Sequence, residues 1–98
     1  MAAYMVVMAK VHDRQRFLAD YGAPAAALIQ QFGGEYLVRA PGALALEGPL
    51  ESGFSVVISR WPDRAAIERF WASPDYAPLR AAREGLADVT VFCVEDPA

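Results

Sequence analysis

Apolar residues recur along the chain with two different spacings, which together predict a mixture of strands and helices. Short runs rich in β-branched and aromatic residues are typical of strands, and an apolar residue every third or fourth position indicates an amphipathic helix. We expect strands at 3–11, 35–40, 54–61 and 89–95, with a short continuation at 44–47, and helices at about 14–32, after Asp63 and at about 74–84.

Local signals mark the ends of the predicted helices. Asp13 and Asp63 stand at N-cap positions, where a carboxylate accepts hydrogen bonds from free backbone N–H groups. Pro24 lies inside the first helix and predicts a kink at 21–24, because proline lacks an N–H and crowds the preceding turn. The pair Gly33-Gly34 ends this helix, since glycine readily takes the left-handed cap conformation.

The resulting order is βαββαβ, with the second helix broken in two. This order is the ferredoxin-like plan, in which the strands form one antiparallel sheet and the fold class is α+β. The length of 98 residues allows a single domain, 1–98, with one modest core.

The predicted sheet is apolar on both faces. Strand 3–11 places Met5, Val7, Ala9 and Val11 on one face and Tyr4, Val6 and Met8 on the other. The helices can cover one face only, and soluble monomers rarely leave a large apolar patch in water. Burying several hundred Å² per subunit at ~25 cal/mol per Å² contributes roughly ten kcal/mol before association costs. We therefore expect a homodimer through the sheet face.

Composition and charge exclude several classes of protein. The chain is 55% hydrophobic with a net charge of -3, which excludes a disordered chain. Nine scattered basic residues against twelve acidic ones leave no basic stripe for nucleic acid. No apolar stretch is long enough to span a membrane. A single cysteine, Cys93, and a start without a basic leader predict a cytoplasmic location.

Three segments together resemble a known family. They are Phe32–Arg39, reading FGGEYLVR; Leu46–Gly48, reading LEG; and Phe70–Tyr76, reading FWASPDY. With Arg80 or Arg83 and the valine-rich stretch 89–95 near the end, they resemble the bacterial family named domain of unknown function 1330. The likeness covers nearly the whole chain, although Phe70-Trp71 stands where the family has Trp-Tyr, so one aromatic hydroxyl is lost here.

That resemblance implies membership of the dimeric α/β-barrel superfamily, in which two ferredoxin-like sheets pack face to face. The superfamily includes cofactor-free monooxygenases, small isomerases and haem enzymes, so the resemblance names no single reaction. Our first hypothesis is a small-molecule enzyme of the cofactor-free monooxygenase or isomerase type, with a pocket between helices and sheet. The alternative is a non-catalytic homodimer that binds a small ligand or is purely structural.

Three polar residues are candidate catalytic groups. His12, directly after the first strand, has the chemistry of a general base, and its alternative is a solvated loop residue. Arg39 shares a strand face with Leu37 by simple alternation and is suited to clamp a carboxylate. Glu47, in the family-matching LEG segment, is a second general base or a ligand contact. Arg39 paired with Glu47 or Glu51 is the structural alternative.

Aromatic side chains are the candidate ligand-binding groups. Tyr21, Trp71 and Tyr76 are spaced to face inward from the helices, where they line either an apolar pocket against the sheet or an ordinary core. The two tyrosine hydroxyls need hydrogen-bond partners wherever they are buried.

One histidine and one cysteine are too few for a typical zinc or iron site, so we expect no metal. We also expect no cofactor, and a haem held by His12 is the alternative left open. Cys93 lies in the middle of a strand without a neighbouring basic residue, which favours an inert buried thiol over a nucleophile.

Overall fold

The computed structural model describes residues 1–97, and Ala98, the last residue of the predicted domain, lies outside them. Within this range the elements follow the predicted order. They are β1 (Ala3–Val11), α1 (Arg14–Phe17), the π-helical turn η1 (Leu18–Gly22), α2 (Ala23–Gln31), β2 (Glu35–Ala40), β3 (Ser55–Trp61), α3 (Arg64–Ala72), α4 (Ala77–Ala82) and β4 (Ala87–Glu95). The predicted caps are confirmed: Asp13 accepts from the Arg16 N–H at 3.1 Å and Asp63 accepts from the Ala66 N–H at 2.9 Å.

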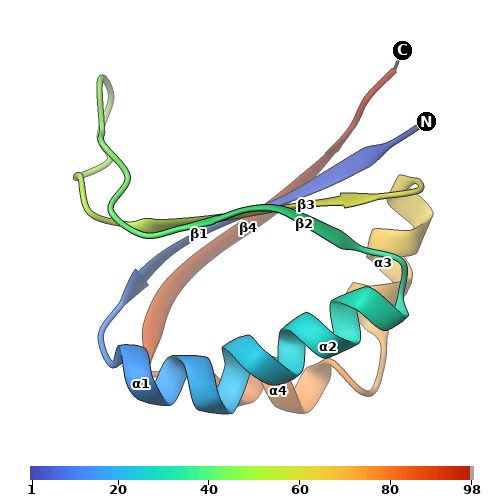
Figure 1. The fold of residues 1–98 in the computed structure, drawn as a ribbon, viewed down its shortest axis with the longest axis horizontal. Helices are drawn as coiled ribbons and strands as arrows, with labels where there is room; N and C mark the ends of the chain where they lie inside the picture. Colours follow the sequence, from blue (N-terminus) through green and yellow to red (C-terminus); the bar gives the residue numbers. More distant parts are fainter. Residues whose placement is uncertain (98) are drawn as a thin grey trace.

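The four strands form one antiparallel sheet with the order β2-β3-β1-β4, which is the ferredoxin-like arrangement. The helices all lie on one side of this sheet (Figure 1). The predicted α+β fold class is therefore confirmed. No helix within residues 1–97 is long and apolar enough to cross a membrane.

The predicted kink in the first helix takes the form of a π-helical turn. The Ala23 N–H donates to the Leu18 carbonyl, five residues earlier, which widens the turn. Pro24 follows directly and has no N–H to offer the Asp20 carbonyl, so the ordinary α-helical pattern is interrupted there. The wide turn therefore lies directly before the proline. Tyr21 is part of this turn and lies on the side of the helix that faces the sheet.

Two sequence predictions are corrected. The expected strand continuation at 44–47 lies in the loop 41–54, because pairing across this loop stops at Ala43, which bonds to Gly53 and Phe54. The expected helix at 74–84 is shorter and begins at Ala77, since residues 74–76 form a turn in which the Ser73 side chain accepts from the Tyr76 N–H at 3.2 Å. Pro78, rather than the proline before it, occupies the first helical turn.

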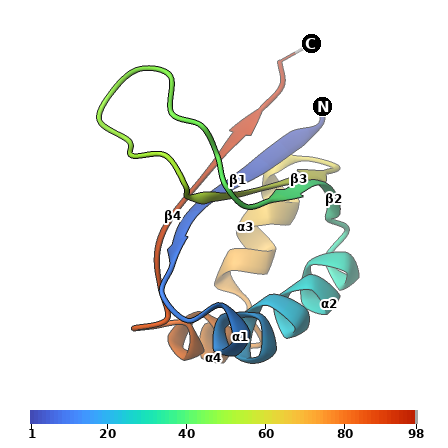
Figure 2. The same ribbon diagram turned by 60° about the vertical axis from the view of Figure 1, so that its left-hand side comes forward.

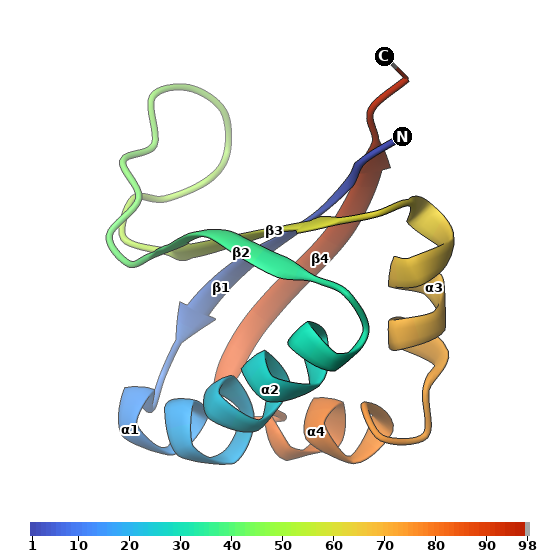
Figure 3. The same cartoon turned by 45° about the vertical axis from the view of Figure 1, so that its right-hand side comes forward.

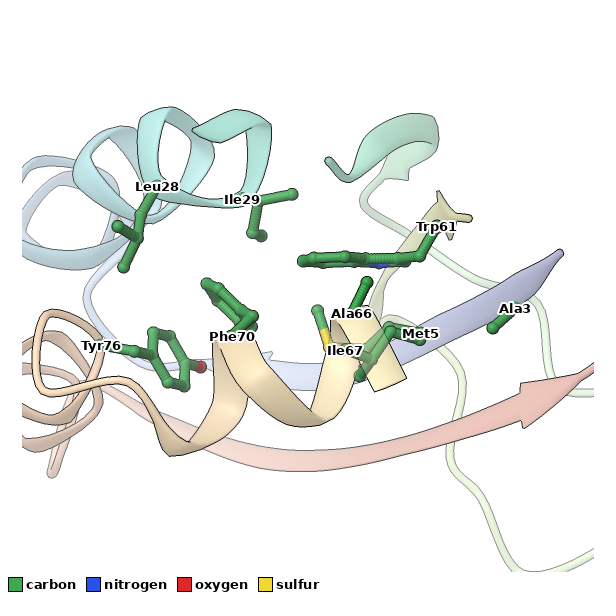
Figure 4. Packing of buried hydrophobic residues seen from close by; sticks show 9 residues of the cluster. All are labelled: Ala3, Met5, Leu28, Ile29, Trp61, Ala66, Ile67, Phe70 and Tyr76. Atoms are coloured by element: carbon green, nitrogen blue, oxygen red, sulfur yellow. The ribbon is translucent and has the colours of Figure 1, made fainter. Parts of the chain in front are cut away.

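The core lies between the sheet and the helices. Trp61 and Phe70 are almost completely buried, with ring centroids 5.3 Å apart, and Leu28 and Ile29 of α2 point toward them (Figure 4). The Trp61 indole N–H donates to the Ser59 hydroxyl at 2.9 Å, which satisfies both buried polar groups. Gly34 abuts this cluster so closely that an added Cβ would lie 2.6 Å from the Ile29 side chain.

The other side of the sheet has no helix over it and is also apolar, as predicted. We call it the open face; Arg60 and Thr90 lie on it, and its apolar side chains are Tyr4, Val6, Met8, Val38, Val56, Ile58, Phe92 and Val94. Phe92 is 47% exposed and Val94 is 53% exposed. The loop 41–54 rises on this side, away from the helices, in all three views (Figures 1, 2 and 3). Its leucines, Leu44 and Leu46, are 75% and 89% exposed.

Candidate functional site

A cavity of about 360 Å³ lies between the sheet and the helical run of α1, η1 and α2. We call it the sheet–helix cavity. Its apolar lining comes from both layers and includes Met5, Val7, Ala9, Phe17, Ala25, Ile29 and Val57. Its polar lining consists of Arg14, Tyr21, Tyr36, Arg39 and Ser55. An apolar body with a few convergent polar groups is the usual composition of a small-molecule site.

A β-bulge in β2 determines which residues of that strand reach the cavity. Tyr36 lies opposite Ser59 and Val38 lies opposite Ile58, so Leu37 is the extra residue. Strict alternation places Arg39 with Leu37, and that prediction is corrected here, because the bulge shifts the alternation by one residue. Tyr36 and Arg39 therefore share the cavity side, with the guanidinium 4.6 Å from the centre of the Tyr36 ring.

Arg14 approaches the same cavity from the first residue of α1. The Asp13 cap fixes the start of this helix, and the Arg14 guanidinium reaches across to the Ser55 hydroxyl of β3 at 3.4 Å. Within residues 1–97 neither Arg14 nor Arg39 forms an ion pair with a carboxylate. No acidic residue is among the side chains that line the cavity.

Tyr21, Tyr76 and Arg83 form a hydrogen-bonded group that we call the Tyr–Tyr–Arg cluster. The two hydroxyls lie 2.7 Å apart, and the Arg83 guanidinium donates to Tyr21 at 3.0 Å and to Tyr76 at 3.1 Å. Burial raises the pKa of Tyr21 well above its ordinary value, and the neighbouring Tyr76 raises it further. Burial also raises the pKa of Tyr36. The prediction that the hydroxyls of Tyr21 and Tyr76 need hydrogen-bond partners is confirmed.

Counting protons in the Tyr–Tyr–Arg cluster leaves one hydroxyl proton over. Arg83 only donates, and the contact between the two phenols uses one of their two O–H groups. The other O–H has no acceptor inside the cluster. Tyr76 is 1% exposed, whereas Tyr21 also lines the sheet–helix cavity. Tyr21 is therefore the phenol whose spare proton has access to a ligand.

The structure brings together only part of the sequence-predicted site. Arg39 and Tyr21 line the sheet–helix cavity, and the Tyr76 hydroxyl is hydrogen-bonded to that of Tyr21. Trp71 lines a separate depression between α3 and β4, where the Arg80 guanidinium lies 4.8 Å from its ring centre.

The other two predicted catalytic groups lie outside this cavity. His12 is exposed, with its Nε2 2.9 Å from the Asp88 carboxylate on β4. Glu47 is exposed in the loop 41–54. The alternative pairing of Arg39 with Glu47 or Glu51 is not formed within residues 1–97. The catalytic roles of His12 and Glu47 stay predictions.

Sequence reasoning missed four polar members of the site: Arg14, Tyr36, Ser55 and Arg83. Arg14 follows the predicted cap Asp13, so the sequence predicts its position in the first helical turn. Its reach to β3 depends on the distance between the two layers. Tyr36 and Arg83 appeared only within family-matching segments, because their surroundings depend on the bulge and on the end of α4.

Within residues 1–97 no group of three or more His, Cys, Asp and Glu side chains is arranged to hold a metal ion. Cys93 is a free thiol, half-buried against the core. A second depression, of about 370 Å³, lies beside α4 and is lined by Arg80, Arg83 and Glu84 among small side chains. It lacks the apolar body that an organic ligand needs, so the sheet–helix cavity is the candidate site.

Comparisons with known proteins agree with this fold. The family model described as "Domain of unknown function (DUF1330)" matches residues 2–97. No curated protein matches the chain significantly.

Three solved structures illustrate the likeness. A protein of unknown function from Rhodopseudomonas palustris is 18% identical with a TM-score of 0.78, covering 99% of this chain and 83% of its own. SnoaB, a cofactor-independent oxygenase from Streptomyces nogalater, is 20% identical with a TM-score of 0.71, covering 99% and 94%. A dimeric ferredoxin-like protein of unknown function from Jannaschia sp. CCS1 is 14% identical with a TM-score of 0.73, covering 98% and 100%. At these identities the likeness establishes a shared fold.

Proposed function

The chain belongs to the family described as Domain of unknown function (DUF1330), and from that premise we propose that it is a homodimeric small-molecule enzyme of the cofactor-independent oxygenase type. The observation that carries the proposal is the sheet–helix cavity, which joins an apolar body to the half-buried, hydrogen-bonded phenol of Tyr21. An isomerase with the same cavity and a non-catalytic ligand-binding homodimer are the alternatives.

The cavity suits a flat organic molecule of one or two rings. Its volume of about 360 Å³ falls in the range of small-molecule sites, and its apolar lining would replace water around an aromatic body. Tyr21 stays neutral because its pKa is raised, and Arg83 draws electron density from its oxygen. Its spare O–H would therefore donate a hydrogen bond to an oxygen atom of the substrate, where negative charge develops as electrons leave the ring.

The reaction class is the oxidation of an electron-rich hydroxyarene by O₂. With α-naphthol as the example, the O–H proton and the para C–H hydrogen leave the ring, and one atom of O₂ becomes the new carbonyl oxygen. The other oxygen atom leaves as water with the two hydrogens, so the products are a naphthoquinone and water. The ring supplies all the electrons. The likeness to SnoaB supports this class over the isomerase alternative.

Oxygen consumption and quinone absorbance test this function with a panel of hydroxynaphthalenes. We expect turnover by the wild-type protein and a loss of about a hundredfold or more in Tyr21→Phe, because one hydrogen bond to developing charge is removed. Val57→Phe fills the cavity from β3 and should abolish both binding and turnover.

Val91→Phe is the matched control, because Val91 lies on the helix-covered side of the sheet but outside this cavity. Binding without turnover across the panel would contradict the enzyme and favour the non-catalytic alternative. An unchanged affinity in Val57→Phe would show that the ligand binds elsewhere.

The dimer part of the proposal rests on the open face. Its eight apolar side chains lie on all four strands, and a second copy of the same face is the simplest cover that hides them from water. The loop 41–54 rises on the same side, so its exposed leucines would pack against the partner (Figure 2). The dimeric Jannaschia neighbour supports this arrangement.

Sedimentation equilibrium tests the dimer directly. We expect a mass twice the 10.7 kDa of the chain. A lone 10.7 kDa particle at micromolar concentration would contradict the dimer. We also place the protein in a reducing, cytoplasmic compartment, because it carries one cysteine only.

A further inference from the structure

We propose that the ligand of the sheet–helix cavity is an organic carboxylate, whose flat apolar body fills the cavity and whose anionic group binds Arg14 and Arg39 at the cavity mouth. This inference rests on the proposed function, in that it takes the cavity to be the ligand site. It adds the chemical class of the ligand and assigns Arg14 and Arg39 as the residues that select it.

The charge balance of the cavity is the first argument. The lining contains two guanidinium groups and no carboxylate, although acidic residues outnumber basic ones in the chain as a whole. Two arginines on the outer surface of the described part of the chain have carboxylate partners, since Arg16 lies 3.7 Å from Asp20 and Arg64 lies 3.0 Å from Glu68. Within the same described residues neither Arg14 nor Arg39 has one. At the cavity the compensating anion is missing from the protein, so a bound ligand is placed to supply it.

The convergence of the two guanidinium groups is the second argument. Arg14 comes from α1 and contacts Ser55 of β3, while Arg39 comes from β2 and lies opposite Val57, two residues along the same strand. Both side chains therefore reach the same end of β3, from opposite layers. Two guanidinium groups at one opening offer several N–H donors to the oxygens of a carboxylate.

Arg39 is also held ready for this contact. Its guanidinium lies over the Tyr36 ring at 4.6 Å, an interaction that orients the side chain without using all its N–H donors. The apolar lining behind the mouth excludes a small inorganic anion as the natural occupant, because such an ion would leave the cavity body unfilled. A carboxylate attached to an aromatic or similarly flat body satisfies both ends of the site.

A pair of probes that differ in charge alone tests the inference by calorimetry. Naphthoate and naphthamide share one ring system, and the first carries a carboxylate where the second carries a neutral amide. For the wild-type protein we expect naphthoate to bind about tenfold more tightly, since exposed charge-assisted hydrogen bonds are screened by solvent. Arg39→Gln and Arg14→Gln should each remove most of this preference, because each lowers the affinity for naphthoate more than the affinity for naphthamide.

Two control variants separate a specific contact from a general change in charge. Arg69→Gln removes the same charge from the exposed surface of α3, outside the cavity, and should leave the preference for naphthoate intact. Arg39→Lys keeps the charge and should restore part of the preference, which a purely structural role of Arg39 would not produce.

Three outcomes would overturn the inference, and they are distinguishable from failure of the proposed function. Equal affinities for both probes, unchanged by either variant, would refute the carboxylate while leaving the cavity as the ligand site. Dissociation of the dimer by Arg39→Gln, seen by sedimentation, would assign Arg39 to the subunit contact instead. Absence of binding by both probes would refute the cavity as the ligand site, and the proposed function would fall with it.

Discussion

The two faces of the sheet are similar in composition and different in surroundings. On the helix-covered face, apolar side chains such as Met5 and Trp61 are buried, and polar groups gather around one cavity. On the open face, apolar side chains such as Val6 and Phe92 meet no helix. An apolar strand face therefore identifies a surface that must be covered. Only the elements packed against that face decide whether it becomes a core, a ligand site or a contact between molecules.

The largest difference between the two sides of the sheet should appear when one phenylalanine is removed from each side, Phe70 of α3 over the helix-covered face and Phe92 of β4 on the open face. Phe70→Ala deletes a fully buried ring from the core and should lower the free energy of unfolding by about 3–5 kcal/mol. Phe92→Ala should act through association instead, so its effect should grow smaller as the protein is diluted. Urea unfolding at several protein concentrations measures both. If Phe92→Ala lowered the free energy of unfolding by a large amount at every protein concentration, Phe92 would belong to the core and not to a contact between molecules.

A charge placed in the middle of the open face should separate the two copies. Val6 pairs with Ile58 on one side and Phe92 on the other, so it lies at the centre of that face. Val6→Lys should weaken association by about a hundredfold or more, because an unpaired ammonium would be buried between the sheets. Ala65→Lys, at the exposed start of α3, is the control. A dimer of Val6→Lys with wild-type affinity would contradict association through this face.

The helix-covered face should reject even a single methyl group at Gly34. An added Cβ there would lie 2.6 Å from the Ile29 side chain and 2.8 Å from the Trp61 ring, both of which are buried. Gly34→Ala should therefore lower stability by roughly 1–3 kcal/mol. Gly42→Ala would meet no atom within 4 Å and tests the cost of its positive φ alone. Thermal unfolding compares the two variants, and equal losses would deny the close approach.

The smallest effect concerns pH. Burial raises the pKa of Tyr21, so the folded state holds this proton more tightly than the unfolded state does. Its contribution to stability is complete below the ordinary tyrosine pKa and is lost as the pH rises beyond it. Tyr21→Phe should cost about 1 kcal/mol at neutral pH. It should also flatten the fall in stability that begins as the pH rises above about 10. Tyr4→Phe, which removes a hydroxyl from the open face, is the comparison, and an identical pH profile for both would refute the effect.

Much of the fold could be predicted because it depends on local chemistry. Asp13 and Asp63 cap helices for reasons contained in a few neighbouring residues, and the two apolar faces of β1 follow from a period of two. The prediction of a strand at 44–47 was wrong. The apolar residues of this stretch suggest a strand, but the loop 41–54 contains no partner strand for them.

The candidate site was predictable only in part. Tyr21, Tyr76 and Arg39 could be chosen because buried phenols need partners and an arginine at the end of an apolar strand is unusual. Their arrangement could not be read from the sequence, because Arg83 reaches Tyr21 from 62 positions away. Arg14 was missed for the same reason, since its contact with Ser55 spans 41 positions.

The extra residue in β2 has a consequence for how ligand preference would change between relatives. Because Leu37 is the extra residue, deleting it would restore regular pairing and leave Val38 and Arg39 where they are. If the bulge were lost while Leu37 was kept, regular alternation would rotate Arg39 to the open face and turn Val38 toward the cavity. The mouth of the sheet–helix cavity would then change from positively charged to apolar, although every polar side chain would keep its identity. Straightening of this strand without a change in its length would therefore alter the chemistry of the pocket more abruptly than a point substitution in its lining.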